Sequence, residues 1–173
     1  MDRRIPVCLF AAVLVLLMAC QSTATPAPDP APGGFDVNQY VGVYEGTWTN
    51  TTTGATGPAV ITVVANETNR TVSLTLDFGG NYLGLSDPPA FTLAANYDDN
   101  GAVVRGNSEI MGDMDITIDK DGNIVGKLTD LVGGTIPSMT YTGKIGDARL
   151  DTDYTVTLAD GTKTISELRT VRK

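Results

Sequence analysis

Apolar and polar residues alternate one by one along much of this chain. The clearest example is residues 71–78, which read Thr-Val-Ser-Leu-Thr-Leu-Asp-Phe. A side-chain period of two is that of a β-strand with one buried face. The same alternation recurs, more weakly in the last three cases, at residues 113–119, 153–158, 91–97, 124–128 and 139–145. No stretch of about ten or more residues has helical periodicity, so the sequence predicts an all-β fold.

Turn sequences separate these runs at short intervals. Asn100-Gly101, Asp121-Gly122 and Asp160-Gly161 are strong hairpin signals, because these residue types accept the positive φ of tight turns. Short connections make consecutive strands antiparallel neighbours. A flat sheet of about 8–10 such strands has exposed edges, and closure into a barrel removes them. We therefore predict a single up-and-down antiparallel barrel, with a β-sandwich as the alternative.

The N-terminus is a different kind of segment. Arg3 and Arg4 precede an apolar run over residues 5–17, which Met18, Ala19 and Cys20 follow. The run is shorter than the ~20 residues that span a bilayer. A basic segment, an apolar segment and a small residue, in that order, are typical of a secretory signal. Leu-Met-Ala-Cys at its end resembles the signal peptide of bacterial lipoproteins. That resemblance implies cleavage before Cys20 and lipidation of its thiol, and ordinary secretion with cleavage nearby is the alternative.

The lipoprotein resemblance divides the chain into three parts. Residues 1–19 are the expected signal peptide, residues 20–35 are the lipidated cysteine with a Pro/Ala-rich linker, and residues 36–173 are the barrel domain. Proline alternates with small residues in the linker, which favours an extended, semi-rigid spacer. The resemblance implies that the protein binds the membrane through acyl chains on Cys20. Gln21 in place of an aspartate implies the outer membrane of the envelope, and the extracytoplasmic face of the plasma membrane is the alternative.

Composition argues against several classes of function. The net charge of −8 repels nucleic acid, so we expect no nucleic-acid partner. The chain has no histidine, which is the commonest general base and the commonest metal ligand. Paired carboxylates would suit a glycosidase, but the acids here fall in turns and at outward positions of the alternation. We expect no enzymatic activity, no cofactor and no metal site.

Three short motifs occur in the order found in lipocalins and related calycins. The first is Gly46-Thr47-Trp48, the second is Thr152-Asp153-Tyr154, and the third is Arg169 near the C-terminus. The sequence resembles this family over most of residues 40–172. The resemblance implies a barrel that binds a small apolar molecule. It also implies that an arginine packs on the ring of Trp48; Arg169 is the first candidate for this contact, and Arg172 is the second.

The aromatic residues at inward positions are candidates for ligand contact or for simple core packing. They are Tyr44, Trp48, Tyr97 and Tyr141. Small barrels are either filled by side chains or hollow, and the sequence leaves both open. The alternative function is binding of an envelope protein through the outer face or the loops. Residues 79–89 form a long Gly- and Pro-containing loop that we expect to expose contact residues.

Overall fold

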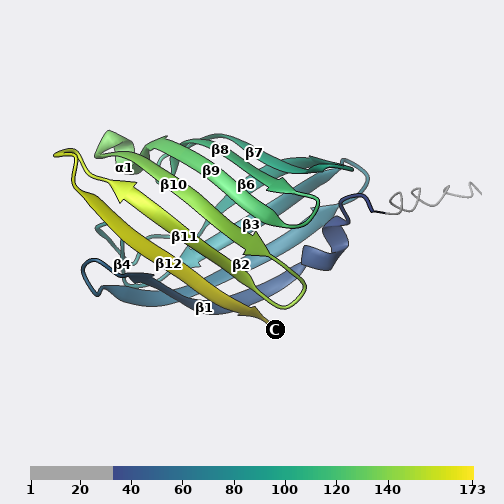
Figure 1. The fold of residues 1–173 in the computed structure, drawn as a ribbon, viewed down its shortest axis with the longest axis horizontal. Coiled ribbons are helices and arrows are strands. Elements are labelled where there is room, and N and C mark those ends of the chain that lie inside the picture. Colours follow the sequence, from purple (N-terminus) through teal and green to yellow (C-terminus); the bar gives the residue numbers. More distant parts are fainter. Residues whose placement is uncertain (1–32) are drawn as a thin grey trace, which may run out of the picture.

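The computed structural model describes residues 33–173 (Figure 1). The predicted signal peptide, Cys20 and nearly all of the linker lie outside the described residues. Phe35, the last residue of the predicted linker, is buried, and its amide donates a hydrogen bond to the Asp99 carbonyl at 2.9 Å. The described part is therefore the barrel domain together with the end of its linker.

Residues 33–173 form twelve strands, one 3₁₀ helix and one short helical turn. In chain order these elements are η1 (Val37–Tyr40), β1 (Gly42–Asn50), β2 (Thr56–Asn66), β3 (Thr71–Phe78), β4 (Asn81–Tyr82), β5 (Leu85–Ser86), β6 (Phe91–Asp98), β7 (Gly101–Ser108), β8 (Gly112–Asp119), β9 (Asn123–Asp130), α1 (Leu131–Gly134), β10 (Ile136–Ile145), β11 (Leu150–Thr157) and β12 (Lys163–Arg172).

Ten of these strands close into one antiparallel barrel (Figure 1). Their order is β1-β12-β11-β10-β9-β8-β7-β6-β3-β2, so neighbours in the barrel are neighbours along the chain and β12 closes on β1. Strands β4 and β5 pair only with each other. The prediction of an all-β, up-and-down barrel is confirmed, and the sandwich alternative is wrong.

The predicted hairpin sequences lie at the turns, and an aspartate at or two residues before each predicted pair caps the turn. Asp119 Oδ1 accepts hydrogen bonds from the amides of Asp121 and Asn123, both at 2.9 Å. Asp98 and Asp160 cap the other two turns in the same way, each at 2.8 Å. These bonds fix local geometry without distant partners, which explains why a short-range signal located the turns.

Both ends of the barrel are closed by residues that lie outside the ten barrel strands. At one end, which we call the η1 end, η1 and its flank bury Phe35, Val37 and Tyr40. At the other, which we call the insert end, β4–β5, the β7–β8 connection and α1 bury Tyr82, Met111 and Leu131. The core lies between these two closures.

The segment between β3 and β6 is exposed over most of its length, with one buried aromatic residue. Asn81, Ser86, Asp87 and Pro89 are exposed, as expected for residues 79–89, but Tyr82 is only 1% exposed. Its ring stacks on Phe78 with centroids 4.2 Å apart and meets Trp48 edge-on at 5.5 Å. The segment folds back over the barrel because packing the tyrosine ring against two other aromatic rings has a lower free energy than leaving that ring in water.

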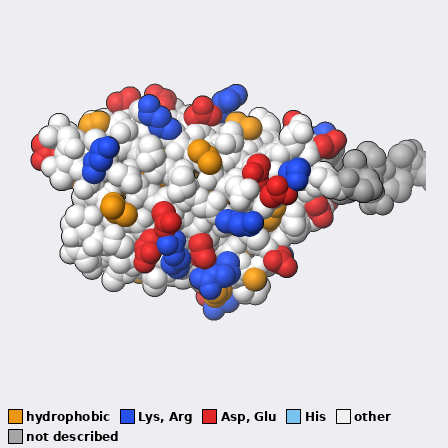
Figure 2. All heavy atoms as spheres, in the orientation of Figure 1, with side chains coloured by type: hydrophobic (Ala, Val, Ile, Leu, Met, Phe, Trp, Pro, Cys, Tyr) orange, Lys and Arg blue, Asp and Glu red, His pale blue; other side chains and the backbone are white. Residues whose placement is uncertain are grey.

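The outer surface carries charges of both signs. In the face shown in Figure 2, acidic and basic side chains are interspersed, and apolar side chains appear as separate spots. Several of the charges form exposed ion pairs, such as Arg105 with Asp115. Within residues 33–173, no helix combines the length and the apolar character needed to cross a bilayer.

Candidate functional site

An apolar cavity of about 80 Å³ lies inside the barrel. Sixteen side chains line it. They come from strands β2 to β4, from strands β6 to β12 and from the β7–β8 connection. They are Ile61, Leu74, Leu76, Phe78, Tyr82, Leu93, Val104, Met111, Ile116, Ile118, Ile124, Tyr141, Leu150, Thr152, Tyr154 and Leu168. Residues 33–173 contribute no charged side chain to this lining, so the cavity suits an uncharged group.

The residual exposure of certain inward side chains marks where the barrel is hollow. Leu74, Leu76, Ile116 and Tyr141 occupy inward positions of their strands but are only partly buried. All four line the cavity. By contrast, Leu128 and Met139 are completely buried and lie outside the lining. The hollow therefore occupies one part of the interior, and the rest is packed.

Three tyrosines lie together in the cavity wall. Tyr141 on β10 and Tyr154 on β11 are directly paired across the ladder, and their rings stack at 5.3 Å. Tyr82, in β4, lines the same cavity. Burial raises the pKa of Tyr141 to about 12, although a hydrogen bond with Tyr82 partly offsets this. Burial also raises the pKa values of Tyr82 and Tyr154, so all three hydroxyls stay neutral at physiological pH.

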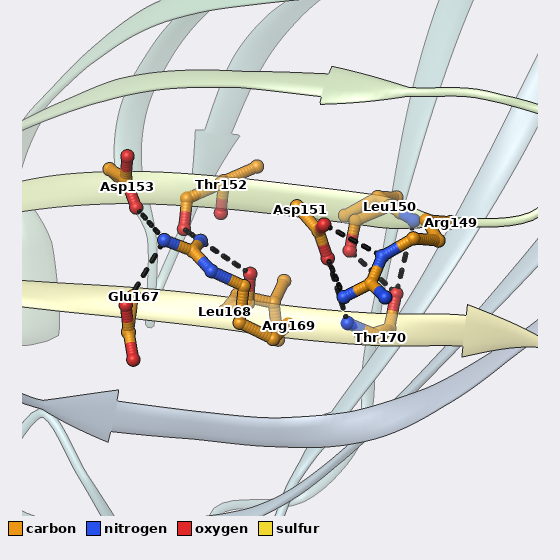
Figure 3. Close-up of polar contacts among 9 residues, drawn as sticks. All are labelled: Arg149, Leu150, Asp151, Thr152, Asp153, Glu167, Leu168, Arg169 and Thr170. Atoms are coloured by element: carbon orange, nitrogen blue, oxygen red, sulfur yellow. Dashed lines mark hydrogen bonds and ion pairs between the residues drawn. The ribbon is translucent and has the colours of Figure 1, made fainter.

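Thr152 brings a second kind of polar group to the wall. Its side chain is 5% exposed, and among the described residues its Oγ1 has no hydrogen-bond partner. A buried hydroxyl without a partner costs about 1–3 kcal/mol. Thr170, on the neighbouring strand, is equally deep but well bonded: its Oγ1 donates to the Leu150 carbonyl at 2.6 Å (Figure 3). The two threonines therefore differ in bonding and not in burial.

The barrel wall is incompletely paired beside the cavity. Strands β6 and β7 form only four residue pairs, from Ala95↔Val104 to Asp98↔Gly101. Residues 91–94 and 105–108 extend beyond this ladder without pairing to each other. Gly106 falls at an inward position, opposite Met114, yet it is exposed and a Cβ added there would meet no atom within 4 Å. The β6–β7 ladder is therefore incomplete in its insert-end half, beside the cavity residue Leu93.

The four aromatic residues proposed for ligand contact are not brought together. Tyr141 lines the cavity. Trp48 is buried at the insert end, where its Nε1 donates to the Gly79 carbonyl at 2.9 Å. Tyr44 lies at the η1 end, where its hydroxyl bonds the Tyr40 carbonyl at 2.9 Å. Tyr97 is partly buried beside Phe35 at that end. Only Tyr141 is therefore placed for direct contact with a molecule in the cavity.

The motif residues have structural positions, with one correction. Gly46 lets β12 approach β1, since an added Cβ would lie 1.9 Å from the Arg169 carbonyl oxygen. Arg169, however, lies on the outer face, 38% exposed, between Asp153 and Glu167 (Figure 3). Trp48 points inward, so the implied packing of Arg169 on its ring is wrong. Arg169 follows inward Leu168 and precedes inward Thr170, and the strand alternation therefore turns it outward.

Arg172 has a different role from the one considered for it. Its guanidinium donates to the carbonyls of Gln39 at 2.9 Å, Asp147 at 3.3 Å and Val41. Carbonyls at the end of a helical turn lack partners within the turn, and a guanidinium satisfies several at once. Arg172 therefore holds η1 over its end of the barrel.

Sequence reasoning missed the cavity residue Tyr82 and the unpaired end of β7 around Gly106. Tyr82 stands in a Gly-rich segment that has no alternation, so no local signal marked it as buried. The unpaired end of β7 had a signal: residues 105–108 read Arg-Gly-Asn-Ser, which puts no apolar side chain at the inward positions 106 and 108. A strand half without apolar inward residues has little to bury against its neighbour.

The described part of the chain has no group of three or more Asp, Glu, Cys or His side chains placed to hold a metal ion. Its carboxylates lie in turns and on the outer face, apart from the cavity. The sequence matches no known protein-family model. A search of curated proteins gives no significant match either.

Proposed function

We propose that this protein is a non-enzymatic lipoprotein of the bacterial cell envelope that binds a small apolar ligand inside its barrel. The cavity is the observation that carries the ligand. It lies in the core, its lining is almost entirely hydrocarbon, and its few polar groups are neutral hydroxyls. Concave apolar sites with few polar groups are the usual form of small-molecule sites.

The volume of the cavity limits what it holds. About 80 Å³ is well below the roughly 300 Å³ at which sites for drug-sized ligands begin. The ligand group inside the barrel is therefore small. Met111 lines the cavity, and its unbranched, flexible side chain adapts to guests of slightly different shape.

The anchoring half of the proposal rests on the sequence. Arg3, Arg4, the apolar run and Cys20 support export and lipidation, and the Pro-rich linker supports a spacer between the lipid and the barrel. The charge of the chain and its lack of histidine support a binding role over an enzymatic one. The outer membrane is the location we favour, from Gln21.

Two measurements test the two halves separately. Intact-mass spectrometry of protein from its native host should show a chain that begins at an acylated Cys20, and an uncleaved Met1 or a bare thiol would contradict lipidation. For the ligand, a short alkane should raise the melting temperature, because binding to the folded state alone stabilises it by mass action. An unchanged melting temperature at saturating alkane would contradict interior binding.

A second candidate is recognition of an envelope protein at the insert end. A groove of about 440 Å³ lies there between residues 85–89, residues 109–110 and α1. Val132 in α1 has a φ of 51°, which is unfavourable for a β-branched residue, and strained residues of this kind cluster at functional sites. If this groove binds a protein, Pro89→Asp should abolish recovery of a partner that the wild type captures, and equal recovery would remove the candidate.

A further inference from the structure

We propose that the ligand is a hydrocarbon chain and that it enters the barrel from the side, between β6 and β7, with its end in the interior cavity. This inference rests on the proposed binding function and specifies both the ligand class and its route. Three observations lead to it: buried side chains cover both ends of the barrel, the ladder between β6 and β7 is incomplete, and the cavity is apolar and small.

Buried aromatic side chains cover both ends of the barrel. At the η1 end, the rings of Phe35 and Tyr40 pack with centroids 5.3 Å apart, and the Arg172 guanidinium holds η1 by a hydrogen bond to the Gln39 carbonyl. At the insert end, Tyr82 stacks on Phe78 and meets Trp48, and its ring is anchored by both contacts. Opening either end requires several buried aromatic side chains to leave the core together.

The wall between the insert-end halves of β6 and β7 is different, because no hydrogen-bonded ladder has to break for these strands to separate. Continuing the β6–β7 register beyond Ala95↔Val104 places Leu93 opposite Gly106 and Thr92 opposite Asn107, but these residues do not pair. Leu93 lines the cavity, so the unpaired segment lies directly beside it. We call this pair of unpaired segments, residues 91–94 and 105–108, the lateral mouth.

The chemistry around the lateral mouth changes from apolar inside to polar outside. Leu76, Leu93 and Ile116 line the cavity behind it. Outside, Thr92 and Asn107 are exposed, and Arg105 is exposed and paired with Asp115 at 3.2 Å. An amphiphile matches this arrangement, with its chain in the hollow and its head in water.

The size of the cavity favours the end of a chain over a ring. About 80 Å³ is roughly half of the ~150 Å³ engineered cavity that accepts benzene. A saturated chain is thinner than a ring, and it can continue outward through the mouth while its end fills the hollow. A free single-chain amphiphile and a membrane lipid share this chain, and the experiment below separates them.

The test uses the mature chain from residue 20 with Cys20→Ser, which keeps every described residue and contains no other thiol. Trp48 is the single tryptophan and lies 5.5 Å from the cavity residue Tyr82, so a bromine atom in the cavity will quench its fluorescence. The probes are a terminally brominated alkane, the fatty acid of the same length brominated at the same end, and vesicles of phospholipid brominated at the chain end. Quenching by the free probes or by the vesicles identifies the source of the chain.

A staple across the lateral mouth tests the route. Thr92→Cys with Asn107→Cys, bridged by a short bifunctional thiol reagent, closes the mouth. The matched control bridges Asn96→Cys to Val103→Cys, a pair that is already joined in the ladder. We expect the first bridge to slow quenching by at least about tenfold, because binding then requires an end to open, and the second to leave the rate unchanged.

The outcomes separate this inference from the proposed function. If the bromoalkane quenches Trp48 equally fast with and without the bridge at residues 92 and 107, the lateral route is wrong although binding stands. If no probe quenches the wild type, the binding function itself is wrong. Leu76→Phe provides a check without cysteines: filling the hollow should weaken bromoalkane binding, whereas Ile165→Phe on the outer face should not. Equal affinity of the two variants would place the chain outside the cavity.

Discussion

Replacing Thr152 by valine should stabilise the protein, although the residue is buried. The Oγ1 of Thr152 has no hydrogen-bond partner among residues 33–173, and a methyl group of the same size needs none. Leaving a buried hydroxyl unpaired costs about 1–3 kcal/mol, and we expect Thr152→Val to recover about 1–2 kcal/mol of unfolding free energy. For a domain of this size that corresponds to a rise of about 4 °C in melting temperature.

Thr170→Val is the matched control, with the opposite expected sign. Its hydroxyl donates to the Leu150 carbonyl at 2.6 Å and accepts from the Leu150 amide at 3.3 Å. The valine leaves the buried carbonyl unpaired, which should lower the unfolding free energy by about 1–3 kcal/mol. Both variants replace a hydroxyl by a methyl group, at residues that are 5% exposed (Thr152) and 1% exposed (Thr170). A difference in burial therefore does not explain opposite changes in stability.

Urea unfolding of the two variants and the wild type, followed by Trp48 fluorescence, measures the difference. The slopes of the three transitions should agree, so that midpoints report stability. If Thr152→Val is destabilised as much as Thr170→Val, the Thr152 hydroxyl has a partner in solution, such as a buried water, and the reasoning from its unpaired state is refuted.

Three further predictions concern pH, backbone approach and the η1 closure. Burial raises the pKa of Tyr141 from 10.0 to about 12. The contribution of this residue to the free energy of unfolding is therefore fully present below pH 10 and is lost as the pH rises toward 12, by up to about 3 kcal/mol. Urea unfolding at pH 9 to 12 should show that slope, and Tyr141→Phe should reduce it; an unchanged slope contradicts the assignment. Gly46→Ala should cost about 3 kcal/mol through its clash with the Arg169 carbonyl, whereas Gly146→Ala, with open space around it, should be nearly neutral in the same assay. Arg172→Met should increase hydrogen exchange at residues 35–41 by releasing η1, and unchanged protection there would contradict its role.

Local patterns were enough to predict the barrel. Alternation in β3, β8 and β11 defined the inward faces, and Asn-Gly and Asp-Gly pairs defined the connections, because both depend on neighbours in sequence. Residues whose position depends on distant contacts were harder. Tyr82 is buried only because β3 and β1 supply Phe78 and Trp48 beneath it.

Arg169 shows the opposite kind of error. The alternation of Ser166, Leu168 and Thr170 was visible in the sequence and is sufficient to place Arg169 outside, but the family resemblance assigned it to the tryptophan ring. The strand geometry decides, because a residue between two inward neighbours points outward. Of the four aromatic residues that the sequence suggested for ligand contact, only Tyr141 lines the cavity. Thr152 and Tyr154, which the sequence marked as motif residues, also line it.

A crystal structure of the mature chain with the terminally brominated alkane tests the central claim most directly, because bromine gives an anomalous signal that marks its own position. We expect one bromine peak inside the barrel, among Leu93, Ile116 and Tyr141, with the chain continuing between β6 and β7. A peak only on the outer face, or an empty interior at saturating alkane, would contradict a ligand-binding barrel.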